Sequence, residues 1–244
     1  MVFTFIAMLV IALPVASAYI ASSSNYRIQT DSVNIGGIFS TSTSYRAEDT
    51  LSEEGVGTST SATYNIKAGY QQMQQTYLAI TSSPNVTLSP SILALGGGVA
   101  NGLATWTVTT DNAAGYTMNI RSSGSPALVS GVNNFADYVP AGANPDFTFI
   151  TPTTANRFGF SPEGTDIVQK FKDNGTICNA GSLDTLSACW SPLQTTANTI
   201  VTRTSPNNPS GTVTSVRFRA ESGVSNTQAL GSYVATTTLT ILAL

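Results

Sequence analysis

The chain of 244 residues contains no histidine, few charged residues and only two cysteines. Without histidine, the commonest general base and metal ligand is missing, and every Ser-His-Asp or Cys-His catalytic arrangement is excluded. Charged residues make up 9% of the sequence, against roughly 25% in typical soluble domains. The net charge of −3 and the pI near 4.8 argue against nucleic acid or an anionic membrane as a partner.

Sequence motifs of several enzyme classes are also missing. The chain has no G-x-S-x-G elbow and no glycine-lysine pair for a phosphate-binding loop, and Gly96-Gly97-Gly98 predicts a flexible turn. Paired carboxylates are the one catalytic pattern left, but the acidic residues fall in predicted turns or loops, where solvated surface charge is the simplest interpretation. The residues concerned are Glu48, Asp49, Glu53, Glu54, Glu163, Asp166 and Asp173. We therefore predict a protein that is not an enzyme, with no catalytic residues and no cofactor.

Calcium binding is a second alternative to a purely structural role. Asp166, Asp173, Asn174 and Asp184 fall in one stretch, and oxygen ligands suit calcium. The stretch has neither EF-hand nor nonapeptide spacing, and Asp173-Asn174-Gly175-Thr176 predicts a turn. The sequence therefore predicts no metal site.

Hydroxyl side chains take the place of the missing charges. The chain has 35 threonines and 29 serines, about a quarter of all residues. Threonine suits the exposed face of a strand, where its branched Cβ packs on the pleated surface. This composition is typical of extracellular β-proteins.

The first 18 residues carry no charged side chain and end in Ala16-Ser17-Ala18. This pattern predicts a cleaved signal peptide over residues 1–18, although the basic residues that usually begin such a peptide are missing. A membrane anchor is the alternative, but the apolar run is short and Pro14 interrupts it. Since no later stretch is apolar enough to span a bilayer, we expect the mature chain from Tyr19 to be secreted and extracellular, without a membrane partner.

Residues 19–75 contain a short repeat. Tyr26, Tyr45 and Tyr64 are spaced nineteen residues apart, and Gly36 and Gly55 each follow a tyrosine by ten residues. A fixed period of this kind predicts one repeated supersecondary unit, here a short strand that begins at the tyrosine and leads into a glycine turn. A disordered Ser/Thr-rich linker is the alternative. Because about fifty residues have little core of their own, the repeat must pack on the rest of the chain or on a neighbouring molecule.

Residues 76–244 follow a polar glutamine-rich join and show strand patterns at both ends. Trp106 and Val108 alternate with threonines, and after a turn at 112–115 Tyr116 and Met118 alternate with polar residues. We interpret these two segments as a β-hairpin. Near the other end, residues 212–220 and 231–244 also alternate, with Val216 and Phe218 inward and arginines outward.

The middle of this region, about residues 122–209, is irregular. The segments FTFIT, RFGF and NTIVTRT predict strands, and DIVQKFK predicts either one helical turn or a strand. Strands at both ends with a loop-rich insertion between them predict an antiparallel β-sandwich, so the fold class is all-β.

The loop-rich insertion also holds both cysteines and most candidate contact residues. In an exported chain, Cys178 and Cys189 are expected to form one disulfide, since metal binding would need closer spacing and more ligands. Aromatic residues here could stack on a sugar, and Trp190 and Phe158 are the named candidates for ligand contact. The alternative interpretation places them in the core, with Trp190 packed on the disulfide.

Two resemblances accompany these patterns. The N-terminal pattern with S-x-x-Y-x-I, a following glycine and Y-x-I-x-A-G-Y is similar to N-terminal segments of uncharacterised secreted bacterial proteins, which implies a cell-surface or extracellular location. The later segments WTVTTDNAAGYTMNI and GSYVATTTLTI resemble the β-sandwich domains of bacterial surface-layer-associated and fimbrial-type proteins. This second likeness implies a structural role.

The sequence therefore predicts a non-enzymatic, secreted, cell-surface structural or adhesive protein, with a self-assembling filament or coat subunit as its specific form. Its partners would be other copies of itself or cell-wall components. A monomeric extracellular module that binds glycan or protein is the alternative.

Overall fold

The computed structural model describes residues 39–42, 46–48, 56–60, 65–69, 76–82, 85–142 and 145–244. The chain divides into two units, Met1–Gln75 and Thr76–Leu244. The predicted signal peptide lies outside the described residues, and so do the repeat positions Tyr26, Gly36, Tyr45, Gly55 and Tyr64. The signal peptide and the repeat therefore stay predictions.

Short antiparallel strand pairs make up the described part of the first unit. They are β1 (Phe39–Thr41) with β2 (Arg46–Glu48), and β3 (Gly57–Thr60) with β4 (Asn65–Ala68). Strand β2 begins at the residue after Tyr45, and β4 begins at the residue after Tyr64. These positions are nineteen residues apart, as the predicted repeat requires, but the repeat itself stays a prediction.

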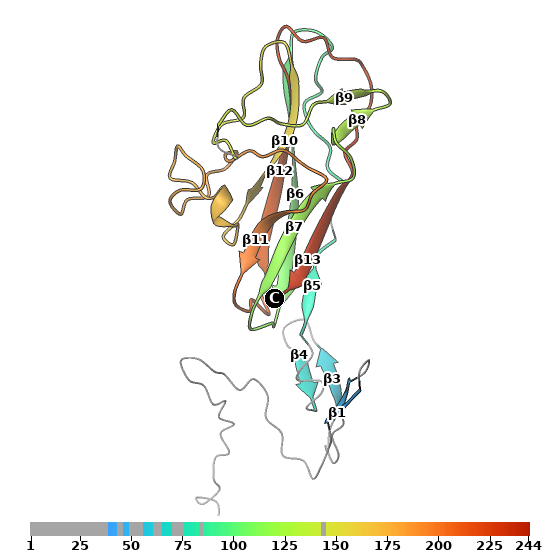
Figure 1. Cartoon of the computed structure of the whole chain (residues 1–244), viewed down its shortest axis with the longest axis vertical. Helices are drawn as coiled ribbons and strands as arrows, with labels where there is room; N and C mark the ends of the chain where they lie inside the picture. Colours follow the sequence, from blue (N-terminus) through green and yellow to red (C-terminus); the bar gives the residue numbers. More distant parts are fainter. Residues whose placement is uncertain are drawn as a thin grey trace, which may run out of the picture. The chain divides into compact units, whose positions relative to one another are not determined.

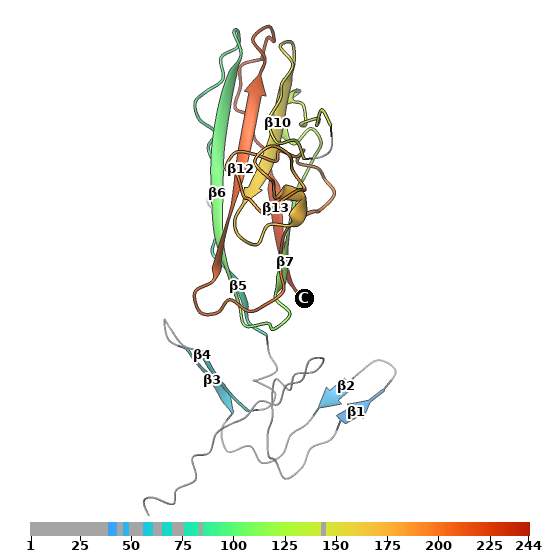
Figure 2. The ribbon, with the colours of Figure 1, turned by 90° about the vertical axis from the view of Figure 1, so that its left-hand side faces the viewer.

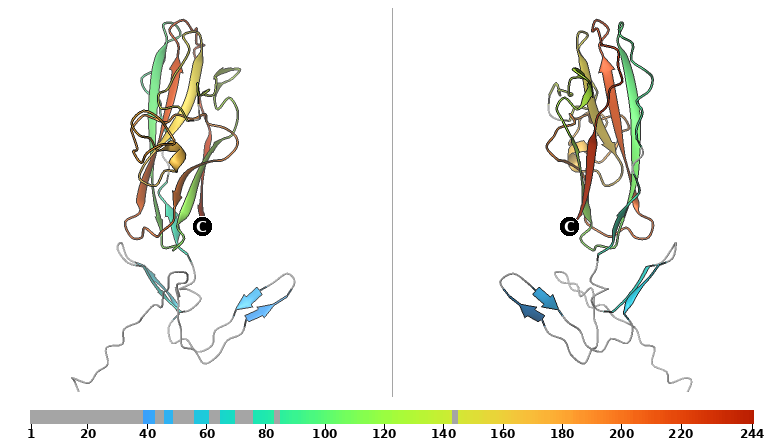
Figure 3. Two further views of the ribbon diagram at one scale, coloured as in Figure 1. Left: turned by 60° about the vertical axis from the view of Figure 1, so that its left-hand side comes forward. Right: turned by 90° about the vertical axis from the view of Figure 1, so that its right-hand side faces the viewer.

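The second unit is an antiparallel β-sandwich, so the predicted all-β fold class is confirmed. Its first sheet has the order β10 (Asn156–Glu163), β12 (Thr212–Ser222), β6 (Gly98–Thr110) and β5 (Leu78–Ile80). Its second sheet has the order β11 (Asn198–Arg203), β7 (Tyr116–Ser122) and β13 (Thr237–Ala243). Figure 1 labels these strands, and Figures 2 and 3 show β6, β12 and β10 side by side in one layer.

Alternating side chains from the two sheets form the core between them. In β7, from Ala104 onward in β6 and from Thr214 onward in β12, every second residue is buried, as their sequence alternation predicts. Val216 is fully buried and Phe218 is 7% exposed, so their predicted inward orientation is confirmed. The largest fully buried side chains are Trp190, Tyr116, Tyr138, Phe160, Phe171, Met118, Ile120, Leu193, Ile200, Val108, Val201 and Val216.

The predicted hairpin between residues 104–110 and 116–121 is wrong in its pairing. Both strands exist, but β6 pairs with β12 and β5, whereas β7 pairs with β11 and β13. At Gly115, whose φ is +84°, the chain crosses from one sheet to the other, and the Gly115 N–H donates to the Asn112 carbonyl at 2.9 Å. Apolar residues at alternate positions face the core whether the two strands pair in one sheet or belong to opposite sheets. The alternation therefore does not distinguish a hairpin from a crossing between sheets.

The loop-rich insertion has less strand structure than its sequence predicts. RFGF lies in β10 and NTIVTRT contributes β11, whereas residues 147–151 form no strand. Residues 169–171 form a single 3-10 turn, η1 (Gln169–Phe171), and β8 (Leu128–Ser130) pairs with β9 (Asn133–Phe135). The predicted disulfide between Cys178 and Cys189 is present.

The two flanks of the sandwich differ. One flank, here called the closed flank, consists of edge strands β10 and β11 with residues 164–197 packed against them. The opposite flank, here called the open flank, consists of edge strands β5 and β13. In Figure 1, η1 and its neighbouring loops lie beside β10 and β11, on the side away from β13.

Candidate functional site

The open flank carries an uncharged groove between the two sheets, lined by both apolar and hydroxyl side chains. Residues 78–82 of β5 and its extension form one wall, and residues of β13 form the other. Trp106 of β6, only 5% exposed, lies at the base, and the groove has a volume of about 490 Å³. The side chains that line it are Leu78, Ala79, Ile80, Thr81, Ser82, Trp106, Thr237, Leu239 and Ile241.

Apolar side chains in this groove are incompletely covered. Leu78, Leu239 and Ile241 pack against the buried core but remain half-buried, and Ile80 is 42% exposed. In the neighbouring strand β7, by contrast, Met118 and Ile120 at the same face are completely buried. The sheets therefore present apolar area at this flank that a further strand could remove from water.

The edges beside the groove lack the features that usually prevent strand pairing. Within the described part of the chain, β13 pairs only with β7, and β5 pairs only with β6. Neither strand contains a charged residue or a proline, and no charged residue lines the groove. Exposed edges that are apolar, uncharged and free of proline can pair with another chain, because their outer N–H and C=O groups have no other partner.

On the closed flank, by contrast, both edge strands are hydrogen-bonded to the insertion. Phe160 of β10 exchanges backbone hydrogen bonds of 3.0 and 2.9 Å with Ser191. On β11, the Val168 N–H donates to the Ile200 backbone carbonyl, and the Thr202 N–H donates to the Asp166 backbone carbonyl. Edge pairing is therefore already satisfied by the chain itself on this side.

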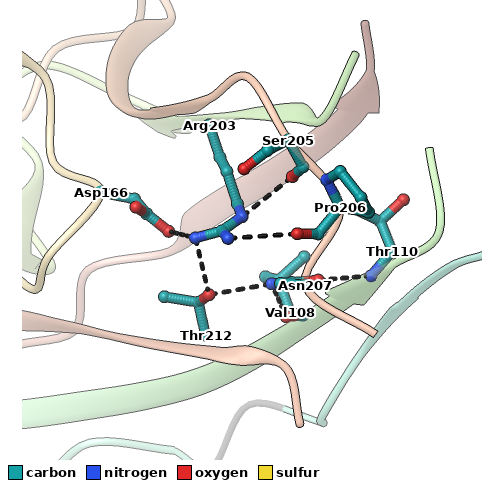
Figure 4. Close-up of polar contacts among 8 residues, drawn as sticks. All are labelled: Val108, Thr110, Asp166, Arg203, Ser205, Pro206, Asn207 and Thr212. Carbon is teal, nitrogen blue, oxygen red and sulfur yellow. Dashed lines mark hydrogen bonds and ion pairs between the residues drawn. The ribbon is translucent and has the colours of Figure 1, made fainter. Parts of the chain in front are cut away.

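A polar network joins the two sheets next to the closed flank (Figure 4). Arg203 of β11 donates to the Asp166 carboxylate at 2.9 Å and to the Thr212 hydroxyl of β12 at 3.3 Å. The Nε and Nη2 atoms of Arg203 donate to the carbonyls of Ser205 and Pro206. The guanidinium is thus engaged by the protein, which assigns it a structural role.

Asn207 extends this network into the first sheet. Its side-chain amide donates to the Val108 carbonyl at 2.8 Å and to the Thr212 hydroxyl at 2.9 Å, and its carbonyl accepts from the Thr110 N–H at 2.7 Å (Figure 4). The residue therefore ties the loop before β12 to β6.

Three of the acidic residues considered for catalysis, Glu163, Asp166 and Asp173, have protein partners. Glu163 forms a two-point ion pair with Arg217 at 2.7 and 3.1 Å and accepts from the Ser187 N–H. Asp166 pairs with Arg203. Asp49, Glu53 and Glu54 lie outside the described residues. Glu163 and Asp166 therefore act as structural acceptors, and we assign neither of them to catalysis.

The hydrogen bonds of Asp173 explain why the stretch considered for calcium binding forms a turn, as its sequence predicts. Its fully buried carboxylate accepts hydrogen bonds from the Gly175 N–H at 2.7 Å, the Thr185 N–H at 2.9 Å and the Thr185 hydroxyl at 2.8 Å. Burial alone would raise the pKa of Asp173, but these hydrogen bonds outweigh it and lower the pKa. Asn174 accepts from the Thr176 and Ile177 N–H groups, which completes the turn.

In the same stretch, the Asp184 carboxylate accepts from the Gly164 N–H. Burial raises the pKa of Asp184. No group of three or more His, Cys, Asp or Glu side chains placed to hold a metal occurs among the described residues.

The two aromatic candidates for ligand contact are in the interior. Trp190 is 1% exposed and Phe158 is 2% exposed. The Trp190 ring packs edge-on to Phe149 at 5.1 Å, and its N–H donates to the Ser187 carbonyl. Phe158 stacks on Phe218 across the β10–β12 pair. Neither ring has a face available at the surface, so we propose no ligand contact for them.

A polar hollow of about 470 Å³ lies elsewhere on the sandwich. Asp137 is at its rim, and its carboxylate already accepts from the Ser125 hydroxyl at 2.6 Å and the Ala127 N–H at 2.8 Å. The hollow is lined by Ser125, Asp137, Tyr138, Val139, Pro140, Gly142, Pro192, Gln194, Thr195 and Thr196. Its lining offers hydroxyl and amide groups to a neutral polar ligand.

The groove is the feature that sequence reasoning did not find. The alternation of Leu239 and Ile241 predicts a strand with one buried face, but it does not reveal that this strand lies at an edge. A signal was nevertheless present, because both edge strands lack the charges and prolines that normally protect an edge.

Comparison of the chain with protein-family models, with curated proteins and with solved structures finds no match. Within the described residues, no helix is long and apolar enough to cross a membrane.

Proposed function

We propose that this protein is a non-enzymatic, extracellular structural or adhesive subunit that joins other polypeptides by strand pairing at its open flank. The observation that carries this proposal is the uncharged groove between β5 and β13, into which half-buried apolar side chains point from edges that carry no charge. Strand addition at such an edge supplies affinity through backbone hydrogen bonds, and the groove adds apolar burial.

Several features support an extracellular location. The disulfide between Cys178 and Cys189 suits an oxidising compartment. Residues 1–18 have the pattern of a cleaved signal peptide, and the low charge with high threonine content suits an exported β-protein.

Size-exclusion chromatography with light scattering, followed by negative-stain microscopy, tests the proposal on the exported protein with its disulfide intact. We expect filaments or large regular oligomers whose fraction rises with protein concentration. A monomer of chain mass at every concentration would contradict a self-assembling role.

The polar hollow at Asp137 favours one second candidate, a monomeric module that binds a neutral glycan or a protein loop. A glycan array tests this role, with Gln194→Ala as the variant expected to lose binding and Gln169→Ala, which does not line the hollow, as the control. Array binding that is equal for both variants would remove this candidate.

A further inference from the structure

The chain contains two tripeptides in which asparagine is followed, two residues later, by threonine. They are Asn85-Val86-Thr87 and Asn174-Gly175-Thr176. This is the acceptor pattern for attachment of a glycan to the asparagine of an exported protein. Because the pattern also arises by chance, the surroundings of each asparagine decide whether it suits modification.

The turn at Asn174 reaches into solvent. Asn174, Gly175 and Thr176 are all exposed. A side chain added at Gly175 would meet no atom within 4 Å, so the space over the turn is open. A transferring enzyme can therefore approach all three residues, and an attached glycan would extend into water without displacing any part of the protein.

Both ends of this turn are fixed by contacts with the insertion. Before the turn, Asp173 exchanges two backbone hydrogen bonds of 2.9 Å with Leu183, and its buried carboxylate accepts from the Gly175 N–H. After the turn, Cys178 is joined to Cys189 by the disulfide. The acceptor tripeptide is thus presented at the tip of a held loop, in a folded protein.

Hydrogen bonds within the turn prepare the Asn174 amide for substitution. Its Oδ1 accepts from the Thr176 N–H at 3.1 Å, the Thr176 hydroxyl at 3.0 Å and the Ile177 N–H at 3.0 Å. These donors stabilise negative charge on that oxygen, as an oxyanion hole does, so the amide nitrogen gives up a proton more readily. Within the described part of the chain, Nδ2 of Asn174 has no hydrogen-bond partner and is available to a sugar.

We propose that Asn174 is the acceptor of an N-linked glycan, which is delivered as a lipid-linked sugar diphosphate. The bond that forms joins Nδ2 of Asn174 to the anomeric carbon of the sugar. The bond that breaks joins this carbon to the diphosphate, which leaves with the electron pair, and the amide proton passes to a base of the transferring enzyme. The proposal does not depend on self-assembly.

The second tripeptide is less suitable, although Asn85 is also exposed. The segment that follows Asn85 lies along β6, because Val86 and Leu88 pack against the core. Ser89 then exchanges backbone hydrogen bonds of 2.9 Å with Asn101 of β6. This segment would have to give up these contacts to form a turn like the one at Asn174.

The two tripeptides also differ in their position relative to the groove. Asn174 belongs to the insertion on the closed flank, so its glycan would leave the edges of β5 and β13 uncovered. The segment after Asn85 pairs with Asn101 on the edge of β6 opposite β12, which is the edge where β5 lies. A glycan on Asn174 is therefore compatible with strand pairing at the open flank.

Peptide mass spectrometry of the protein exported by its own cells tests the proposal. We expect a glycan on the peptide that contains Asn174. Release by a peptide-N-glycosidase, which converts the glycan-bearing asparagine to aspartate, should mark the same position, and a sample without this enzyme corrects for spontaneous deamidation of the Asn-Gly pair. Unmodified Asn174 throughout the exported protein would overturn the proposal.

Variants of Thr176 in the same cells test the acceptor pattern. Thr176→Ala keeps Asn174 but removes the hydroxyl, whereas Thr176→Ser keeps a hydroxyl at this position. We expect the glycan occupancy of Asn174 to fall by about tenfold or more in Thr176→Ala and to stay within about twofold in Thr176→Ser. Equal occupancy in the two variants would contradict the proposal.

Asn85 serves as the comparison within the same molecules. We expect its occupancy to be lower than that of Asn174 by about tenfold or more, because its segment is packed on β6. Equal or higher occupancy at Asn85 would overturn the role assigned to the turn. Asn179→Gln, which changes an exposed asparagine of the same insertion outside any acceptor tripeptide, is the matched control for Asn174→Gln. Only Asn174→Gln should lose the glycan.

Discussion

The two flanks of this sandwich differ in how their edge strands are covered. On the closed flank, residues 164–197 pair with β10 and β11 and complete the burial of Phe171 and Leu193. On the open flank, β5 and β13 end the sheets, and Leu239 and Ile241 remain half-buried.

The difference shows which sheet edges the described part of the chain covers by itself. A sheet edge with polar backbone groups and apolar neighbours is stabilised when another segment covers it. Among the residues that the structure describes, the insertion supplies that segment on one side only. Under the proposed function, another polypeptide supplies that segment on the open flank.

Truncation of one leucine on each flank should give the largest difference between them. Leu193→Ala removes a fully buried side chain, and we expect it to lower the free energy of unfolding by about 2–5 kcal/mol. Leu239→Ala should cost the unassembled protein less than about 2 kcal/mol, since this side chain is only half-buried. Urea denaturation of dilute protein measures both, and equal losses would contradict the comparison.

Removal of the disulfide should weaken the closed flank alone. The Cys178–Cys189 bridge spans 11 residues, and the loop-entropy model gives it about 2–3 kcal/mol. A Cys178→Ser/Cys189→Ser variant should lose this much in urea denaturation, and its oligomer fraction under native conditions should stay unchanged. A loss of assembly in the folded variant would mean that the closed flank takes part in it.

Low pH should also destabilise the closed flank, through protonation of Asp173. Its hydrogen bonds hold the pKa below the ordinary carboxyl value of about 3.9. The ionised form therefore stabilises the fold above that value, and this contribution is lost as the pH falls through the lower folded-state pKa. Asp173→Asn should cost about 1–3 kcal/mol at pH 7, and the difference from the native protein should shrink in acid. Denaturation at pH 7 and pH 3 measures this, and a difference that grows in acid would contradict it.

The smallest effect on stability should come from a charge in the groove. Ile80 is 42% exposed, so Ile80→Lys should change the free energy of unfolding by about 0.5 kcal/mol or less. Light scattering should nevertheless show loss of the oligomers, because the charge would be buried on docking. Ile177→Lys, at an exposed position on the closed flank, is the control and should assemble normally.

Local pattern predicted the strands of this fold better than their partners. The alternation at Trp106 and Val108 and at Met118 and Ile120 placed two strands correctly. It did not show that these strands belong to different sheets, because inward-facing residues look alike in both arrangements. Pairing depends on contacts distant in sequence, such as that of β6 with β12.

The candidate site was less predictable than the fold. The disulfide followed from two cysteines in a chain with export features, and it is confirmed. The aromatic residues Trp190 and Phe158 were ambiguous, since an apolar ring suits a core and a sugar platform equally, and the structure buries both. Only the strand order shows that Leu239 and Ile241 lie at an edge.

Amide hydrogen exchange as a function of protein concentration tests the central claim most directly. Peptides from β13 (Thr237–Ala243) and β11 (Asn198–Arg203) report on the open and closed flanks within one sheet. We predict that exchange in β13 slows markedly between dilute and concentrated protein while exchange in β11 stays constant. Oligomers that form without added protection in β13 would contradict the account.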